Sequence, residues 1–145
     1  MYLGLDLGTS GLKALLVDGA EKIVAESVAP LQVSRPQDGW VEQNPSDWFI
    51  ACENAIAALG VDLSQVQGIG LSGHMHGATL MNASGVPLRP CLLWNDTRAA
   101  VEAAELDADP LWRRISGNIV FPGFTAPKVE WVRRHEPDIF AQIDK

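Results

Sequence analysis

The segment Asp6–Lys13 combines residue types that can hold a phosphorylated ligand. A carboxylate at the end of an apolar run is followed by two glycines, two hydroxyls and a cation, at Asp6, Gly8, Thr9, Ser10, Gly11 and Lys13. The glycines allow several backbone N–H groups to converge on phosphate oxygens, and the hydroxyls and the lysine add donors. Asp6 would repel these phosphates unless Mg²⁺ lay between them, held through water. The segment therefore predicts a hairpin that binds ATP with magnesium.

The same segment also has a plainer interpretation. Glycine-rich turns are common in β-hairpins, and in a plain hairpin Asp6 is simply solvated. The segment is not a P-loop, because it has no Gly-Lys-Ser/Thr element and no helix is expected after the glycines. The glycine spacing of dinucleotide-binding folds is missing as well. Any bound phosphates would therefore lie over a hairpin.

A second polar stretch, Ser72–Thr79, follows another expected strand. Its sequence, SGHMHGAT, places two histidines and a methionine between glycines. Ligands gather at strand ends in open α/β sheets, and glycines allow a close approach of the backbone. His74 and His76 could also be metal ligands, but no third or fourth ligand lies near them in the sequence. The stretch is a candidate small-molecule site, with metal binding as the weaker alternative.

A third stretch, Trp94–Arg98, joins a tryptophan to four polar residues. From the local pattern, Trp94 is a core residue and Asp96 caps a helix that follows it.

Three short apolar runs open the chain at residues 2–7, 12–18 and 23–29, with GTSG and GAEK between them. Runs of this length separated by turn sequences predict a three-stranded antiparallel meander. A helix is expected from Pro45 to about Leu59, because proline favours the first helical turn and Asn44 can cap it. Further strands are expected at residues 66–72 and 78–82, followed by a turn at 82–85.

The part of the chain after Trp94 favours helices. They are expected at residues 96–106, 110–116, 127–134 and 137–143, with prolines at their starts. Strands, a helix and further strands predict an α/β fold with a mixed sheet and a helix-rich second half. A composition that is 47% hydrophobic and 20% charged fits one compact domain.

Composition excludes several classes of partner. The net charge is −7, the isoelectric point is about 4.8, and no basic run is present, which argues against nucleic acid. Asp6 interrupts the first apolar stretch too early for a signal peptide or a membrane span, so a cytoplasmic protein is expected. Cys52 and Cys91 lack metal-like spacing and are expected to be reduced, buried thiols.

Four stretches of the sequence resemble the N-terminal domain of the FGGY carbohydrate kinases and, within them, the xylulose kinases. They are YLGLDLGTSGLKALL, WVEQNPSDWF, GIGLSGHMHGATL, and LRPCLLWNDTRAA with ISGNIVFPGFTAPKVEWVRRHEP following. The resemblance implies an actin-like, ribonuclease H-like fold of two lobes that uses magnesium and ATP to phosphorylate a sugar or polyol. Residues 1–145 would be the N-terminal part of the first lobe. The sequence stops at Lys145 without a change in composition, so we expect the chain to be cut there.

The resemblance also implies roles in sugar binding. Met75 and His76 would contact the ketopentose, and Trp94 would line the sugar site. His74 stands where the family usually has glutamine, so the resemblance gives it no role. Lys128 would be structural and pair with a carboxylate.

For the phosphates, the resemblance implies that Asp6 holds magnesium and that Gly8–Gly11 and Lys13 hold the nucleotide. The aspartate that accepts the hydroxyl proton would lie beyond residue 145, and most of the adenine site would belong to the second lobe. The parent enzyme is therefore expected to convert D-xylulose and ATP to D-xylulose 5-phosphate and ADP, and the isolated chain to be inactive.

Two alternatives remain open at this point. A kinase for another ketose or polyol shares the general plan. A non-catalytic, actin-like nucleotide- or sugar-binding module would use the hairpin but would have no need of Met75, His76 and Trp94 beside it. An open sheet edge at a cut terminus would also favour self-association, so a homodimer is possible.

Overall fold

The computed structural model describes residues 1–145. Instead of the single compact domain expected from composition, the chain divides into two compact units. Unit 1 contains Met1–Val33 and Ser46–His74, and unit 2 contains Ser34–Pro45 and Met75–Lys145. In neither unit is a helix both long and apolar enough to cross a membrane.

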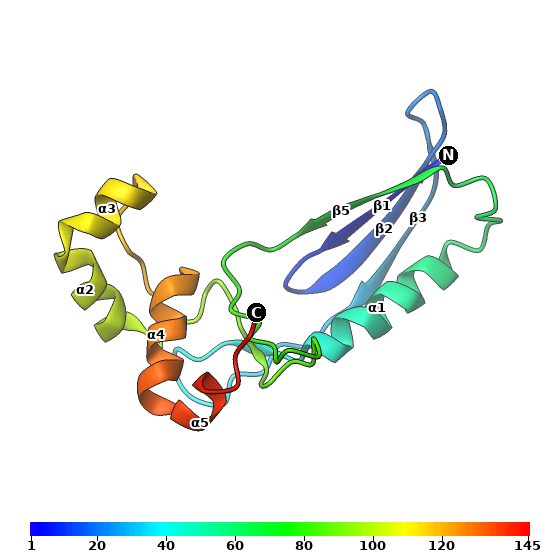
Figure 1. Ribbon diagram of the computed structural model, residues 1–145. Helices are drawn as coiled ribbons and strands as arrows, with labels where there is room; N and C mark the ends of the chain where they lie inside the picture. Colours follow the sequence, from blue (N-terminus) through cyan, green and yellow to red (C-terminus); the bar gives the residue numbers. More distant parts are fainter. The chain divides into compact units, whose positions relative to one another are not determined.

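Unit 1 is a four-stranded sheet with one helix against it (Figure 1). Strands β1 (Tyr2–Leu7), β2 (Gly11–Val17) and β3 (Ile23–Pro30) form an antiparallel meander, which confirms the sequence prediction. Strand β5 (Gly68–Gly73) pairs with β1 in the parallel direction, so the strand order is β3-β2-β1-β5. Helix α1 (Pro45–Ala58) begins at the proline that predicted its start.

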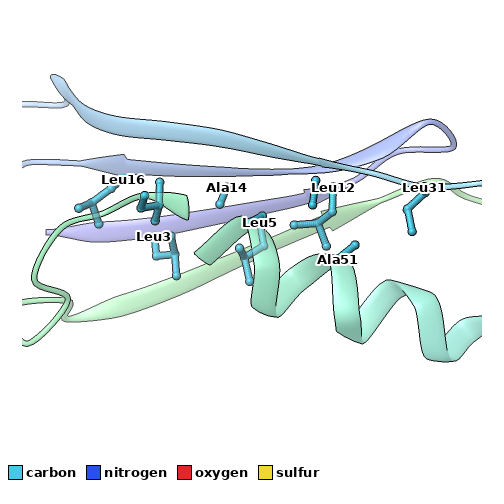
Figure 2. Close-up of a cluster of buried hydrophobic side chains, with 10 residues drawn as sticks. Leu3, Leu5, Leu12, Ala14, Leu16, Leu31 and Ala51 are labelled. Carbon is cyan, nitrogen blue, oxygen red and sulfur yellow. The ribbon is translucent and has the colours of Figure 1, made fainter. Parts of the chain in front are cut away.

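One face of this sheet is apolar and packs against α1 (Figure 2). Alternate residues of a strand point to opposite faces, and here one alternating set is leucine and alanine. The buried set is Leu3, Leu5, Leu12, Ala14, Leu16, Ala29, Leu31, Ala51, Ala55 and Leu59. The residues that alternate with them point to the face away from α1, and among these Asp6 and Lys13 are exposed.

Unit 2 contains most of the helices and little sheet (Figure 1). Its two-residue strands β4 (Glu42–Gln43) and β6 (Cys91–Leu92) pair in the antiparallel direction. Its helices are α2 (Ala100–Ala108), α3 (Pro110–Ser116), α4 (Thr125–His135) and α5 (Pro137–Phe140). A second buried apolar cluster, which includes Leu80, Leu92, Trp131 and Val132, forms the core of this unit.

The prediction of a strand at residues 78–82 is wrong. This segment makes only isolated bridges, Ala78 with Leu92 and Met81 with Pro87, because its neighbour β6 is too short for a continuous ladder. The turn expected after it is present: the side-chain carbonyl of Asn82 accepts hydrogen bonds from the N–H groups of Ser84 and Val86.

Two helices in unit 2 are shorter than expected. Helix α2 begins at Ala100 rather than at residue 96, because the Asp96 carboxylate binds the Val41 N–H and Arg98 instead of capping a first turn. Helix α5 ends at Phe140 rather than at residue 143, since the N–H groups of Asp144 and Lys145 donate to the Met81 carbonyl.

The buried face of the sheet predicts a strong asymmetry between two leucine positions. Leu16 on β2 is fully buried, whereas Leu71 on β5 is 80% exposed. We expect Leu16→Ala to lower the free energy of unfolding by about 2–5 kcal/mol, because it removes apolar contacts and leaves a cavity. Leu71→Ala, the matched control, should change it by less than about 1 kcal/mol. Urea unfolding followed by circular dichroism measures both, and equal losses would contradict the packing described above.

Candidate functional site

Unit 1 has a cavity of about 410 Å³ on the sheet face opposite α1. It is lined by Gly4, Leu5, Asp6, Lys13, Leu15, Gly70, Leu71 and Ser72. Gly4 and Gly70 are opposite each other in the β1–β5 register, and because neither has a side chain the sheet is open there. The cavity therefore has a floor of bare backbone beside a carboxylate.

Asp6 lies between two polar neighbours in this cavity. Lys13 is its partner across the β1–β2 ladder, and Ser72 is its partner across the β1–β5 ladder. The Lys13 ammonium forms an exposed ion pair with Glu26 at 2.8 Å. Sequence reasoning did not place Ser72 beside Asp6, and only the parallel register between β1 and β5 could have revealed it.

The hairpin that joins β1 and β2 uses part of its backbone internally. The Gly8 N–H donates to the Gly11 carbonyl at 3.0 Å, so it serves the turn. A Cβ atom on Gly11 would lie 2.8 Å from the Ala29 carbonyl oxygen, so close packing against β3 requires a glycine there. The structure is therefore compatible with a plain β-hairpin and with a phosphate-binding one. Phosphate binding stays a prediction for Gly8, Thr9, Ser10, Gly11 and Lys13.

Asp6 is the residue of this cavity that could hold a divalent cation. No group of three or more histidine, cysteine or acidic side chains in the chain lies close enough to form a protein-only metal site. Magnesium is commonly held by one or two carboxylates together with water and substrate phosphates. A single exposed carboxylate beside an open cavity fits that mode of binding.

Unit 2 has a separate, larger cavity of about 580 Å³. Its lining comes from three segments of the chain and comprises Met75, His76, Trp94, Asn95, Asp96, Thr97, Phe121, Pro122, Gly123 and Phe124. The structure therefore brings Met75, His76 and Trp94 together, as the resemblance implied. Asp6 and Lys13 belong to unit 1 and line its cavity, whereas Gly8, Thr9, Ser10 and Gly11 of the hairpin are in the same unit but are not among the lining residues.

Aromatic rings form much of this second cavity. The His76 ring lies 4.6 Å from the Phe124 ring, and Phe124 packs edge-on against Phe121 at 5.6 Å. Trp94 is 50% exposed and Met75 is 68% exposed, so neither is a core residue. The expectation that Trp94 is buried in the core is thus wrong. Phe121 and Phe124 belong to the stretch ISGNIVFPGFTAPK, which carries the family resemblance, but no individual role was predicted for them, because aromatic residues in a loop carry no periodic signal.

The two histidines of the second stretch have different surroundings. His74 belongs to unit 1, where its N–H donates to the Leu7 carbonyl and its ring packs edge-on against Trp48 at 5.4 Å. His76 belongs to unit 2 and has a φ of 63°, in the left-handed region that non-glycine residues rarely adopt. The segment is therefore not extended, and the geometry gives no support to a metal site formed by the two rings.

Buried charges fix the loop that carries Trp94. The fully buried Asp96 carboxylate accepts a hydrogen bond from the Val41 N–H at 2.6 Å and from the Arg98 guanidinium at 2.7 Å. Arg98 also pairs with Glu42 at 2.7 Å and stacks over the Trp40 ring at 3.8 Å. Trp40 and Glu42, from the stretch WVEQNPSDWF, thus pack behind the loop that carries Trp94.

Lys128 on α4 is fully buried, and its partners differ from the expected carboxylate. Its ammonium donates to the carbonyl of His76 at 2.8 Å and to the carbonyl of Gly123 at 2.6 Å. Burial lowers the pKa of Lys128 from 10.5 to about 8, although Cys91 and Asp96 nearby oppose the shift. The expected ion pair is therefore wrong, because the ammonium lies between two backbone oxygens.

The fold is that of a carbohydrate kinase domain. All of residues 1–145 match the family model described as the FGGY family of carbohydrate kinases, N-terminal domain. The chain belongs to this family, and its fold is of the actin-like class.

Individual relatives point to one group within the family. The chain is 51% identical to the xylulose kinase of Escherichia coli K12 over 100% of its own length and 31% of that protein. It superimposes on a crystal structure of a xyloylose kinase from Brucella ovis with a TM-score of 0.96 and 61% identity, covering 99% of the chain and 31% of that structure. For a xylulose kinase from Rhodospirillum rubrum the TM-score is 0.90 and the identity 31%, covering 97% and 30%. The chain thus spans about a third of the length of these relatives.

The burial of Lys128 predicts a pH dependence of stability. Unfolding returns the ammonium to water, where its pKa is 10.5, so between pH 8 and pH 10.5 the unfolded chain binds more protons than the folded chain. The free energy of unfolding should therefore gain a contribution of about 1–3 kcal/mol as pH rises through this window.

Urea unfolding of wild type and Lys128→Met at several alkaline pH values isolates this contribution. Other titrating groups act in both proteins and cancel in the difference. If the difference in free energy of unfolding between the two proteins stays constant from pH 8 to pH 10.5, the pKa of Lys128 is not lowered by folding and the prediction is wrong.

Proposed function

We propose that the protein containing this chain transfers the γ-phosphate of ATP to a hydroxyl of D-xylulose, giving D-xylulose 5-phosphate and ADP. The observation that carries the proposal is the second cavity, in which Met75, His76 and Trp94 line one space of about 580 Å³. A cavity of this size with several rings and few polar groups suits a small ligand. Relatives described as xylulose kinases, at up to 51% identity, support the same substrate.

The second cavity can recognise a sugar through two kinds of contact. The half-exposed face of Trp94 offers a surface for sugar C–H groups, which pack on aromatic rings. The imidazole of His76 can donate a hydrogen bond to a sugar hydroxyl or accept one from it, depending on its tautomer. Together these contacts would orient one hydroxyl for reaction and exclude water from its apolar side.

Unit 1 would hold the nucleotide phosphates. When bound, magnesium neutralises charge on the transferred phosphoryl group. In our proposal Asp6 holds that ion through water, while Lys13 and the hairpin Gly8–Gly11 bind phosphate oxygens. Lys13 would exchange its exposed partner Glu26 for phosphate, at small cost, because exposed ion pairs are weak.

We further propose that residues 1–145 are the N-terminal part of the first lobe, and that the carboxylate accepting the hydroxyl proton lies beyond residue 145. The edge strand β5 exposes Ile69 and Leu71, by 62% and 80%, which fits a sheet that continues in the complete protein. Alternatively, a second copy of the chain covers the exposed edge strand β5, which would give a homodimer.

We place the reaction in the cytoplasm, where ATP and free pentuloses are available.

The proposal is tested by ADP release from the intact protein with D-xylulose, D-ribulose, gluconate and glycerol at equal concentrations. We expect the highest kcat/KM with D-xylulose. A higher value with glycerol, gluconate or ribulose would move the protein to another substrate within the same family, and ADP release that no sugar stimulates would reject the kinase assignment.

Substituting Asp6 should separate catalysis from sugar binding. We expect Asp6→Asn to lower kcat by about 10²–10⁴-fold, because magnesium and the transferred phosphate lose their carboxylate anchor, while the KM for D-xylulose changes little. Glu53→Gln, the same chemical change at an exposed site on α1, is the matched control and should leave both constants unaltered. Steady-state kinetics at several magnesium concentrations measures both constants. If Asp6→Asn mainly raises the KM for D-xylulose, the assignment of Asp6 to magnesium binding is wrong.

The opposite pattern is expected for His76. His76→Ala should raise the KM for D-xylulose about 10–100-fold, since a buried hydroxyl of the sugar loses its partner. The KM for ATP should remain near the wild-type value. Initial rates measured over a grid of both substrates distinguish this outcome from a general loss of activity, which would argue that His76 only supports the fold.

A further inference from the structure

Lys128 is a buried cation that neither the phosphate site nor the sugar contacts explain. It lies on α4 with no exposed surface, and its two hydrogen bonds go to the carbonyls of His76 and Gly123. His76 and Gly123 come from different segments, and both line the second cavity. The ammonium therefore connects two sides of the cavity from behind.

Stability alone is a poor reason for a lysine at this position. Its ammonium forms none of the ion pairs within 4 Å in the structure, and burial lowers its pKa to about 8. A buried charge without an opposite charge in contact is costly, and an apolar side chain in the same place is often tolerated or stabilising. The presence of Lys128 is better explained by the two backbone segments that its ammonium holds in place.

His76 is the group that needs to be held. Its φ of 63° is in the left-handed region, where a residue with a Cβ is strained unless its surroundings fix it. In this conformation the His76 carbonyl receives the Lys128 ammonium at 2.8 Å, and the His76 ring lies against Phe124 at 4.6 Å. The second hydrogen bond, to Gly123, fixes the residue that precedes Phe124 in the chain.

We propose that Lys128 is a positioning residue, which holds the backbone of His76 in its left-handed conformation and thereby aims the His76 imidazole into the sugar cavity. The ammonium acts through two carbonyls and does not touch the ligand. The identity of the ligand rests on the function proposed above, whereas the effect of Lys128 on His76 does not.

The effect on His76 can be measured without any ligand. Cα and Cβ chemical shifts report φ and ψ, and the chain has only three histidines, His74, His76 and His135. Histidine-labelled wild type and Lys128→Met are compared by NMR, with the His76 signal identified by its loss in His76→Gln. We expect the His76 shifts in Lys128→Met to leave the left-handed range, while those of His74, in the other unit, stay unchanged. Unchanged His76 shifts would overturn the proposal.

A control separates this role from general packing. Val132→Ala removes buried atoms from the same helix, in the apolar core of unit 2 and not among the cavity-lining residues. It should lower stability without moving the His76 shifts. If Val132→Ala moves them as far as Lys128→Met does, Lys128 is only one packing residue among others. Should Lys128→Met fail to fold, Lys128→Leu, which also has no hydrogen-bond donor, replaces it and its result is interpreted in the same way.

Sugar binding then links the conformation to function. In titration calorimetry of the intact protein with D-xylulose, we expect Lys128→Met to bind about tenfold more weakly than wild type or worse, and Val132→Ala to remain within about twofold of wild type. Equal weakening in both variants would overturn the positioning role. If wild type binds no D-xylulose but the His76 shifts still move in Lys128→Met, the positioning role holds and the proposed substrate is rejected.

Discussion

The buried pair of Asp96 and Arg98 is the interaction on which unit 2 depends. Its two-residue strands cannot organise the long loops around them, so charged groups do so. Asp96 binds the Val41 N–H, and Arg98 lies between Asp96 and Glu42 with its guanidinium over Trp40. Because buried charges are costly unless they are paired, each member of this cluster fixes the position of the next. The loop that presents Trp94 to the cavity is therefore held by charge rather than by a β-ladder.

Unit 1 is built on a different constraint, the period of two along its strands. Leucines and alanines on one face pack against α1, and the same alternation places Asp6 and Lys13 on the other face. Paired glycines at positions 4 and 70 then leave that face open. A rigid apolar layer thus supports an exposed polar surface, which suits the binding of a charged ligand that must also leave.

These two constraints explain what the sequence could predict. The meander and α3 matched their predicted bounds closely, since alternation and proline at a helix start are local signals. Strands β4 and β6 were not predicted, because two residues show no alternation and their pairing joins distant segments. Helix α2 was placed too early, since a local pattern does not reveal that Asp96 binds Val41.

The candidate site also contains residues that could be predicted from the sequence and contacts that could not. Met75, His76 and Trp94 were found through family resemblance, and the structure brings them into one cavity. The partners of Lys128 could not be found, because two backbone carbonyls leave no pattern in the sequence. The same is true of Ser72, whose place beside Asp6 depends on strand register. Contacts made through the backbone are thus the part of a site that residue types alone do not disclose.

The two residues with positive φ and a side chain show how differently strain can be accommodated. Glu21 lies in an exposed turn, where its N–H donates to the Asp18 carbonyl and the Asp18 side chain accepts two further backbone N–H groups. That strain is resolved locally, as in many turns. His76 has no such turn, and its carbonyl is held by a lysine from a helix distant in sequence. Since strained residues persist only where the surroundings over-determine them, a distant and costly partner at a cavity wall argues that the conformation of His76 itself is what the fold preserves.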